Sequence, residues 1–317
     1  MNILVLGGTG FIGSLVCEKL VERSGGAGGR IVVPTRHRGR AKHVQMLPTV
    51  EVIEADVHDE AQLAQLMARC EAVVSLVGVL HGDNAEFERA HVELPRRLAR
   101  ACGVAGVQRV VHVSALGAEF SAPSMYLRSK AAGEAVLRQS GLAVTVLRPS
   151  VVFGAEDRFL NLFARMQAVL PVVPLACAKA QFQPVWVNDV AEAVARTLET
   201  PSTAGQVLDC TGPTIYTLAE LVCLAGRWSG HQRLVLPVPA ALGRLMATLM
   251  ELLPGEPLIS RDNINSMKLP NVASGVRPGL ERLGITPASL EAIAPEMLGG
   301  HGELARLDRW RVQAHGR

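Results

Sequence analysis

The sequence of 317 residues has little net charge and no long uninterrupted apolar run. Its formal net charge is +3 and no run of like charges exceeds a few residues, so we expect no nucleic-acid partner. A membrane-spanning helix needs about 18 or more consecutive apolar residues. The closest segment, 234–253, is interrupted by Pro237, Pro239 and Arg244. The first apolar run, Ile3 to Leu6, is too short for a secretory signal, and we expect a soluble, cytoplasmic protein.

The chain also lacks paired cysteines. Its 6 cysteines stand singly, without a CxxC pair and without the spacing of metal ligands. This pattern is typical of reduced thiols in the core of a cytosolic protein. We therefore expect neither a disulfide framework nor a metal site.

Short β-branched runs alternate with helical patterns through the first half of the chain. The expected strands are 2–6, 30–33, 50–54, 72–77, 109–113 and 143–147. The expected helices are 11–23, 59–70, 86–102 and 126–139. Such alternation predicts an α/β protein in which helices cover both faces of a doubly wound parallel sheet.

After Pro149 this alternation breaks and prolines become frequent. Helices are still expected at 189–199 and 217–228, with Asp189 and Thr217 as N-caps. We expect residues 1–156 and 184–212 to form the sheet domain and residues 157–183 and 213–298 a smaller C-terminal lobe. Residues 299–317 would form a loosely held tail. The smaller lobe would lie over the carboxyl ends of the strands and close a substrate cleft.

The first expected strand leads into a glycine-rich segment, VLGGTGFIG. Gly7, Gly10 and Gly13 have GxxGxxG spacing, and Phe11 and Ile12 begin the expected helix. Glycines at these positions let backbone N–H groups approach a pyrophosphate at the helix N-terminus. Because the segment lies between a strand and a helix, it predicts a dinucleotide site in a Rossmann-type fold.

The second expected strand ends without an acidic residue. An NAD site usually has a carboxylate there for the ribose 2′-hydroxyl, but this chain has Arg36 and Arg38. A guanidinium suits a 2′-phosphate, so NADP(H) is the expected cofactor and NAD(H) is less favoured. A solvated basic loop is the alternative. Asp56, followed by Val57, is expected at the adenine, or else as a cap of the next helical segment.

Tyr126 and Lys130 are four residues apart on an expected helix and so project from one face. A lysine beside a phenol lowers the phenol's pKa from about 10, which lets tyrosine act as an acid or base near neutrality. Ser114 follows a strand and would hold a substrate carbonyl, or else make a turn hydrogen bond. We take Ser114, Tyr126 and Lys130 as the catalytic candidates. Lys130, with Tyr126, would also contact the nicotinamide ribose.

Six segments carry a family resemblance: 7–13, HVSA at 112–115, YLRSKAAGE at 126–134, RPSVVFG at 148–154, EDRFLN at 156–161 and QPVWVNDV at 183–190. They resemble extended, atypical short-chain dehydrogenases/reductases. More narrowly, they are similar to the family of the nucleotide-binding accessory subunit of respiratory complex I, alpha-subcomplex subunit nine, and its bacterial relatives. The first three segments are shared across the superfamily, whereas 157–161 and 183–190 are specific to the narrower family.

This resemblance implies a Rossmann fold with bound NADPH and Arg36 at the 2′-phosphate. The other residues that it places along the nucleotide are Val77, Gly78, Pro149, Val151 and Val152. Mitochondrial members of the family keep the Tyr-x-x-x-Lys pattern and hold the nucleotide structurally, without known turnover. Other relatives are linked to coenzyme Q biosynthesis. The resemblance therefore supports cofactor binding more strongly than catalysis.

Three functions remain open. The sequence favours an NADPH-dependent oxidoreductase that acts on a small hydrophobic carbonyl or quinone-related compound. The second is a non-catalytic, NADPH-holding structural or assembly protein of complex I or of coenzyme Q biosynthesis. The third is a nucleotide-sugar epimerase or dehydratase, which is disfavoured because such enzymes usually use NAD.

Residues 239–253 are expected to form a helix with a wide apolar arc. The arc comprises Leu242, Leu245, Met246, Leu249, Met250, Leu252 and Leu253. Packing of this arc into the chain's own lobe is the favoured alternative, but methionines also suit an adaptable contact surface. We predict that the helix borders the substrate cleft and leaves part of its arc exposed. Its partner would be the inner face of a membrane, contacted peripherally, or a respiratory complex.

Overall fold

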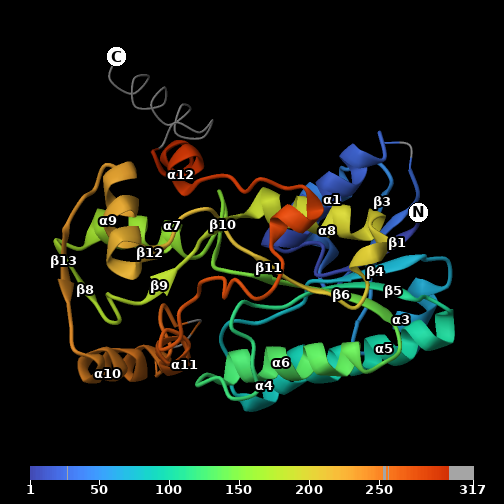
Figure 1. The fold of residues 1–317 in the computed structure, drawn as a ribbon, viewed down its shortest axis with the longest axis horizontal. Helices are drawn as coiled ribbons and strands as arrows, with labels where there is room; N and C mark the ends of the chain where they lie inside the picture. Colours follow the sequence, from blue (N-terminus) through green and yellow to red (C-terminus); the bar gives the residue numbers. More distant parts are fainter. Residues whose placement is uncertain (27, 253–254, 256, 300–317) are drawn as a thin grey trace. The chain divides into compact units, whose positions relative to one another are not determined.

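The computed structural model describes the chain except for residues 27, 253–254, 256 and 300–317 (Figure 1). The expected tail, 299–317, therefore lies almost wholly outside the described residues. The chain divides into two compact units. Unit 1 contains Met1–Pro149, Val187–Thr211 and Ala273–Thr286. Unit 2 contains Ser150–Trp186, Gly212–Val272 and Pro287–Arg317.

Unit 1 is built on a seven-stranded parallel sheet with the order β11-β6-β5-β4-β1-β2-β3. The strands are β1 (Ile3–Leu6), β2 (Ile31–Thr35), β3 (Val50–Glu54), β4 (Ala72–Ser75), β5 (Arg109–Val113), β6 (Ala143–Pro149) and β11 (Val207–Cys210). Every residue of β1 and β4 is buried, because helices cover both faces of the sheet. The predicted doubly wound, Rossmann-type α/β fold is confirmed.

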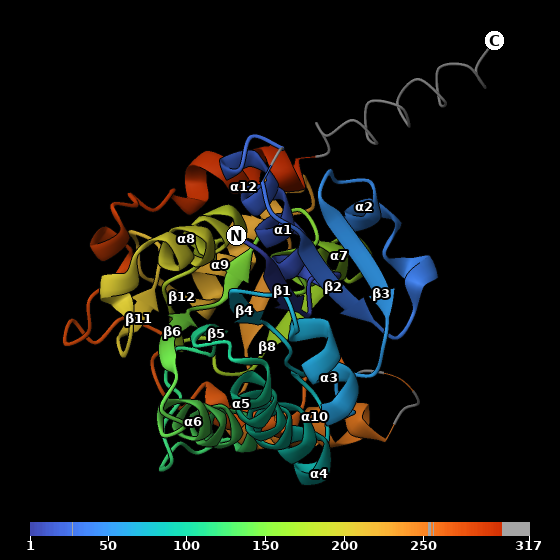
Figure 2. The same cartoon turned by 90° about the vertical axis from the view of Figure 1, so that its right-hand side faces the viewer.

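Helices cover the two faces of this sheet (Figure 2). One face carries α1 (Phe11–Arg23) and α8 (Val187–Glu199), which pack on each other, and the other carries α3 (Glu60–Met67), α5 (Leu94–Ala105) and α6 (Met125–Arg138). The remaining short helices of unit 1 are η1 (Arg38–Arg40), α2 (Lys42–Gln45), α4 (Asn84–Glu88), the π-helical turn η2 (Arg89–Glu93), η3 (Pro201–Thr203) and η4 (Leu280–Leu283). The prediction that Asp189 caps a helix is wrong, because α8 begins at Val187 and Asp189 lies in its first turn.

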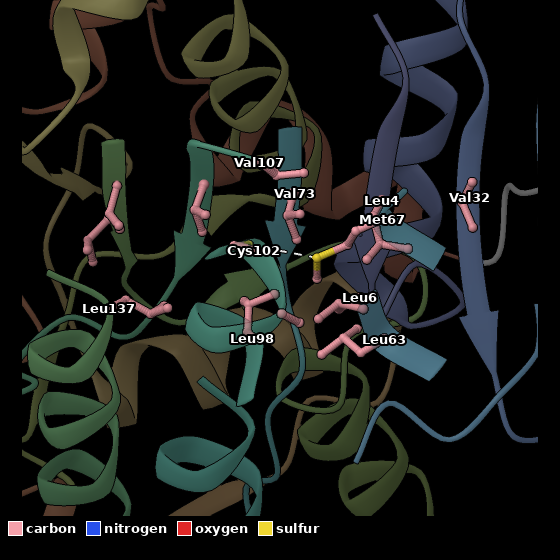
Figure 3. Packing of buried hydrophobic residues seen from close by; sticks show 14 residues of the cluster. Leu4, Leu6, Val32, Leu63, Met67, Val73, Leu98, Cys102, Val107 and Leu137 are labelled. Atoms are coloured by element: carbon pink, nitrogen blue, oxygen red, sulfur yellow. Dashed lines mark hydrogen bonds between the residues drawn. The ribbon is translucent and has the colours of Figure 1, made fainter. Parts of the chain in front are cut away.

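The core of unit 1 fills the space between the sheet and helices α3 and α5 (Figure 3). Leu4 of β1 lies opposite Val73 of β4 in the parallel register. Cys102 of α5 reaches Met67 of α3, with 3.8 Å between their sulfur atoms. All six cysteines lie in the described part of the chain as free thiols, although only three of them are buried. This packing keeps the carboxyl ends of β1 and β4 side by side.

Unit 2 has short paired strands instead of a large sheet. They are β7 (Val152–Phe153) with β10 (Val185–Trp186), β8 (Val172–Leu175) with β13 (Leu234–Pro237), and β9 (Gln181–Phe182) with β12 (Tyr216–Thr217). Its helices are α7 (Leu160–Val169), α9 (Leu218–Trp228), α10 (Ala240–Glu251), α11 (Arg261–Ser266) and α12 (Leu290–Leu298). Thr217 caps α9 as predicted, in a capping box with Glu220.

The helix expected at 239–253 is observed as α10. Its buried side is formed by Gly243 and Ala247, and a Cβ at Gly243 would lie 2.4 Å from the Cβ of Ala176. The exposed side carries a row of four leucines, which are 44–77% exposed: Leu242, Leu245, Leu249 and Leu252. The predicted exposure of part of the arc is therefore confirmed, whereas Leu253 lies outside the described residues. No helix in the described part of the chain is long and apolar enough to cross a membrane.

Candidate functional site

The turn between β1 and α1 depends on three glycines. Gly7 has a φ of +81°, and a Cβ there would lie 3.2 Å from the main-chain nitrogen of Val77. Gly10 donates its N–H to the carbonyl oxygen of Gly7 at 3.0 Å. A Cβ at Gly13 would lie only 2.1 Å from that same oxygen. The first turn of α1 thus rests directly on the Gly7 backbone, and the loop after β4 comes close to it.

The N-terminus of α1 is suited to an anion. Its N-cap, Gly10, offers no side chain to the free N–H groups, and its first turn, which includes Phe11 and Ile12, holds no acidic residue. These N–H groups and the positive end of the helix dipole therefore remain for a ligand. In the strand order, β1 lies between β4 and β2. From β1 the chain continues to β2 and β3 on one side, and it then crosses to β4 and β5 on the other side. A sheet of this kind binds its ligand at that point, beyond the carboxyl ends of the strands. The residues present fit a dinucleotide pyrophosphate.

Basic side chains gather beyond the carboxyl ends of β2 and β3. Arg36 is exposed and forms no ion pair with any residue that the structure describes. The pKa of His58 is lowered, first by burial and then by the charges of Arg89, Arg97 and Arg36, with Asp56 opposing them. Three guanidinium groups from different elements thus act on one histidine. The donor set fits a phosphate at this corner.

Asp56 and Val57 follow β3, as expected. Asp56 accepts a hydrogen bond from the N–H of His58 at 2.9 Å, so it caps a turn, while Asp59 caps α3. Val57 and Val77 are half-buried against the core of unit 1. The carboxylate of Asp56 remains exposed at the basic corner.

Gly78 lies between two buried side chains. A Cβ at Gly78 would be 3.4 Å from Nε2 of His91 and 3.5 Å from Nζ of Lys130. Pro149 ends β6, and its carbonyl oxygen accepts a hydrogen bond from Leu116 at 2.9 Å. The structure thus brings Gly78 next to the lysine that was expected at the nicotinamide ribose.

Val151 and Val152 belong to unit 2. Val151 donates its N–H to Oδ1 of Asn271 at 2.9 Å, and Val152 begins β7. Ser150 donates to the same amide oxygen at 2.6 Å. Asn271 therefore fixes the segment after β6, a role that no motif in the sequence indicated.

Ser114 is buried at the end of β5 with its hydroxyl unpaired. Its N–H donates to the carbonyl oxygen of Leu147 at 2.8 Å. Its Oγ is buried and has no hydrogen-bond partner among the described residues, so it makes no turn hydrogen bond of the expected alternative kind. A buried hydroxyl without a partner is unusual. It is available to a ligand oxygen.

Lys130 is buried and donates to the carbonyl oxygen of Val113, next to Ser114, at 3.0 Å. Burial lowers the pKa of Lys130 to about 8, against the opposing effect of Glu134. Tyr126 lies on the same helix and packs against Ala115 and Ala122. Of the three catalytic candidates, Ser114 thus directly follows β5, and Tyr126 and Lys130 are both on α6.

Burial raises the pKa of Tyr126 to about 12. The expectation that Lys130 lowers this pKa is therefore wrong for the chain by itself. Tyr126 packs against the buried side chains of Ala115, Ala122 and Leu127, while the ammonium of Lys130 is held at the main chain of Val113. At neutral pH the tyrosine keeps its proton.

Two further features were missed from the sequence. His91 is buried against Tyr126, with 5.6 Å between the ring centroids. Arg148 of β6 and Glu134 of α6 form a buried pair of hydrogen bonds, at 2.9 and 2.6 Å, that ties α6 to the sheet. Glu134 and Arg148 both lie in segments that carried the family resemblance, but nothing in their spacing indicated that they pair with each other. A single histidine in a helical pattern gives no functional signal.

The profile of the NAD dependent epimerase/dehydratase family matches residues 3–211. The chain belongs to this family. The solved structure of a nucleoside-diphosphate-sugar epimerase from Staphylococcus aureus has a TM-score of 0.72, with 17% sequence identity, and the match covers 94% of this chain and 100% of that one. This likeness shows the shared fold.

Within the family, the chain is similar to NADH dehydrogenase [ubiquinone] 1 alpha subcomplex subunit 9, mitochondrial, of Mus musculus. The two are 33% identical over 313 residues, which cover 96% of this chain and 81% of the mouse protein. The chain is also similar to 4-hydroxy-2-methyl-3-oxo-4-farnesyl-3,4-dihydroquinoline-1-oxide ketoreductase of Stigmatella aurantiaca. These two are 29% identical over 178 residues, and the match covers 50% of this chain and 52% of that protein. The family resemblance seen in the sequence is confirmed.

The contact between α1 and the glycine turn leads to a first prediction. We expect Gly13→Ala to lower the free energy of unfolding by about 1–3 kcal/mol, because the new methyl group would overlap the carbonyl oxygen of Gly7. The matched control is Gly103→Ala in α5, where a Cβ meets nothing within 4 Å. It should raise the free energy of unfolding by about 0.5–1 kcal/mol. Urea unfolding of the two variants measures both changes in the free energy of unfolding. Equal changes would contradict the close contact between Gly13 and the carbonyl oxygen of Gly7.

Proposed function

We propose that the chain is an NADP(H)-dependent oxidoreductase that reduces a small hydrophobic carbonyl or quinone-related compound. The observation that carries this proposal is the unpaired, buried hydroxyl of Ser114. It lies next to Val113, whose carbonyl oxygen holds the ammonium of Lys130. A polar group that is buried without a partner suits a site that is completed by a ligand.

The choice of NADP(H) rests on the basic corner beyond β2 and β3. The pyrophosphate would bind at the N-terminus of α1, and Arg36 would take the ribose 2′-phosphate. The carboxylate of Asp56 would lie at the adenine. A site for NAD would need an acidic partner for the 2′-hydroxyl. The charges of three arginines, Arg36 among them, act on His58 against that of Asp56, which supports the phosphorylated nucleotide although the family is described as NAD dependent.

Residues of the chain would bind and protonate the carbonyl oxygen of the substrate. When bound, the nucleotide supplies the hydride that reduces the carbonyl carbon. Ser114 would donate a hydrogen bond to the carbonyl oxygen, and Tyr126 would give that oxygen its proton. Tyr126 holds this proton at neutral pH, but its raised pKa makes the phenol a weaker acid, so the transfer would need support from a nearby positive charge. The charge of Lys130 would offset the phenolate that remains.

A second function is supported by the relatives and by the leucine row on α10. The mouse relative is named as a subunit of an NADH dehydrogenase. A chain of this kind would hold NADP(H) structurally and attach to a larger assembly. A sugar-nucleotide epimerase or dehydratase has less support, because it would retain NAD where this chain has Arg36.

The cofactor preference is tested by titrating NADPH and NADH against the protein by fluorescence. NADPH should bind at least about tenfold more tightly, since one charge-assisted hydrogen bond to phosphate is worth roughly 1.5–3 kcal/mol. Arg36→Ala should remove most of this ratio. Arg138→Ala, which removes another exposed arginine at the end of α6, should leave it unchanged. Equal affinities in the wild type would refute the preference.

The catalytic role is tested by variants of the two residues on α6. Tyr126→Phe should lower kcat for carbonyl reduction at least about a hundredfold, because general acid catalysis contributes that much. Its affinity for NADPH should remain nearly that of the wild type. Lys130→Met should impair both kcat and NADPH binding. A fully active Tyr126→Phe variant would rule out the mechanism.

We also propose that the leucine row on α10 attaches the chain peripherally to an anionic membrane surface. Four leucines on one side of a helix are exposed, opposite Gly243 and Ala247. Exposed cations lie close to the start of this helix. Lys179 and Lys268 line a hollow with Ala240, and the charges of Arg244 and Lys268 both act on Cys177 of the same hollow. An apolar row beside basic side chains is typical of helices that lie at a lipid interface.

Leu249→Glu should therefore release the protein from anionic liposomes in a sedimentation assay, without unfolding it. The matched control is Val104→Glu in α5, another exposed apolar helix position, in unit 1. It should leave sedimentation unchanged. The lipid proposal would be wrong if the wild type did not sediment with anionic liposomes. If a respiratory-membrane protein then captured the chain, the partner of the leucine row would be a protein.

A further inference from the structure

His91 lies in the π-helical turn η2 between α4 and α5, and only 2% of it is exposed. Both of its ring nitrogens are engaged. Nε2 accepts a hydrogen bond from the N–H of Val79 at 3.0 Å. Nδ1 lies 2.8 Å from Oγ of Ser129, and that hydroxyl donates to the carbonyl oxygen of Tyr126 at 2.8 Å.

This network determines which nitrogen of His91 carries the proton. The N–H of Val79 can only donate, so Nε2 must accept. The ring proton is therefore on Nδ1 and is donated to the hydroxyl oxygen of Ser129. That hydroxyl in turn donates its hydrogen bond to the main-chain carbonyl oxygen of Tyr126. Burial, and then the charge of Lys130, lower the pKa of His91 to about 3. The ring thus stays neutral near physiological pH.

The ring and the backbone of His91 also pack against the surface of α6. The ring stacks on Phe87 and meets Tyr126 edge-on, with centroid distances of 5.7 and 5.6 Å. A Cβ at Gly133 would lie 1.9 Å from the carbonyl oxygen of His91, so α6 approaches this turn as closely as a glycine allows. Single π turns occur frequently at functional sites. Here the turn places one residue against both α6 and the loop after β4.

We infer that His91 is a positioning residue that joins Gly78 and Val79, on the nucleotide path, to the face of α6 that carries Tyr126 and Lys130. This inference rests on the proposed function, because it takes the loop after β4 as the nucleotide path. Gly78 lies against both Nε2 of His91 and Nζ of Lys130. If the hydrogen bond to Val79 is lost, this loop is no longer fixed relative to the tyrosine.

The test uses two variants and one matched control. His91→Phe keeps the aromatic packing and removes both hydrogen bonds of the ring. Ser129→Ala keeps the bond at Nε2 and removes the bond at Nδ1, together with the bond from the serine hydroxyl to the carbonyl oxygen of Tyr126. Ser140→Ala, the control, removes another serine hydroxyl bonded to a main-chain carbonyl, that of Leu137 at 2.6 Å. His91→Phe should raise the Kd for NADPH and lower kcat by about tenfold each, as the loss of a buried hydrogen bond predicts. Ser129→Ala should have a smaller effect on both, and Ser140→Ala none.

Nitrogen-15 NMR of the labelled protein gives a readout that structural packing alone would not move. It should find His91 neutral and protonated on Nδ1 at pH 7. Protonation on Nε2 would overturn the inference, and so would a folded His91→Phe variant with unchanged Kd and kcat. If His91→Phe does not fold, Ser129→Ala and the NMR signal decide. A wild type that binds NADPH but reduces no carbonyl would refute the proposed reductase, whereas the effect on Kd would still test His91.

Discussion

The close contact between the first turn of α1 and the backbone of Gly7 is the constraint on which the candidate site depends. Because Gly13 has no side chain, α1 can begin directly above the carboxyl end of β1. Its N-terminal N–H groups therefore lie at the carboxyl ends of β1 and β4, the pair at which the strand order reverses. The left-handed turn at Gly7 also lets the loop at Val77 approach. Every other part of the proposed nucleotide site is placed relative to this turn.

Features that depend on neighbouring residues were predicted well from the sequence. Strands β3 and β5 have the expected bounds, since a parallel sheet covered on both faces needs short apolar runs. The glycine turn was found for the same reason, because its spacing and its flanking elements are local. The helix expected at 86–102 is instead divided into α4, the π turn η2 and α5. No periodic pattern marks such a turn, which is held by contacts with α6.

Features that depend on distant residues were not predicted. His91 takes its hydrogen-bond partners from positions 12 and 38 residues away, and Glu134 finds Arg148 on another element. The spacing of Tyr126 and Lys130 correctly placed them on one helix, but it could not indicate how deeply each is buried. Burial decides the direction of both pKa shifts: the tyrosine is held protonated and the lysine becomes a weaker base. The tyrosine of the isolated chain is thus a weaker acid than the sequence suggested.

The central claim is that unit 1 holds NADP(H) at the glycine turn and the basic corner. It is tested most directly by the nucleotide that remains bound to the purified protein, identified by mass spectrometry and absorbance after release. We predict one NADP(H) per chain in the wild type, with loss of this nucleotide in Arg36→Ala. Bound NAD(H) in place of NADP(H), or a wild type that neither retains nor takes up any dinucleotide, would contradict the account.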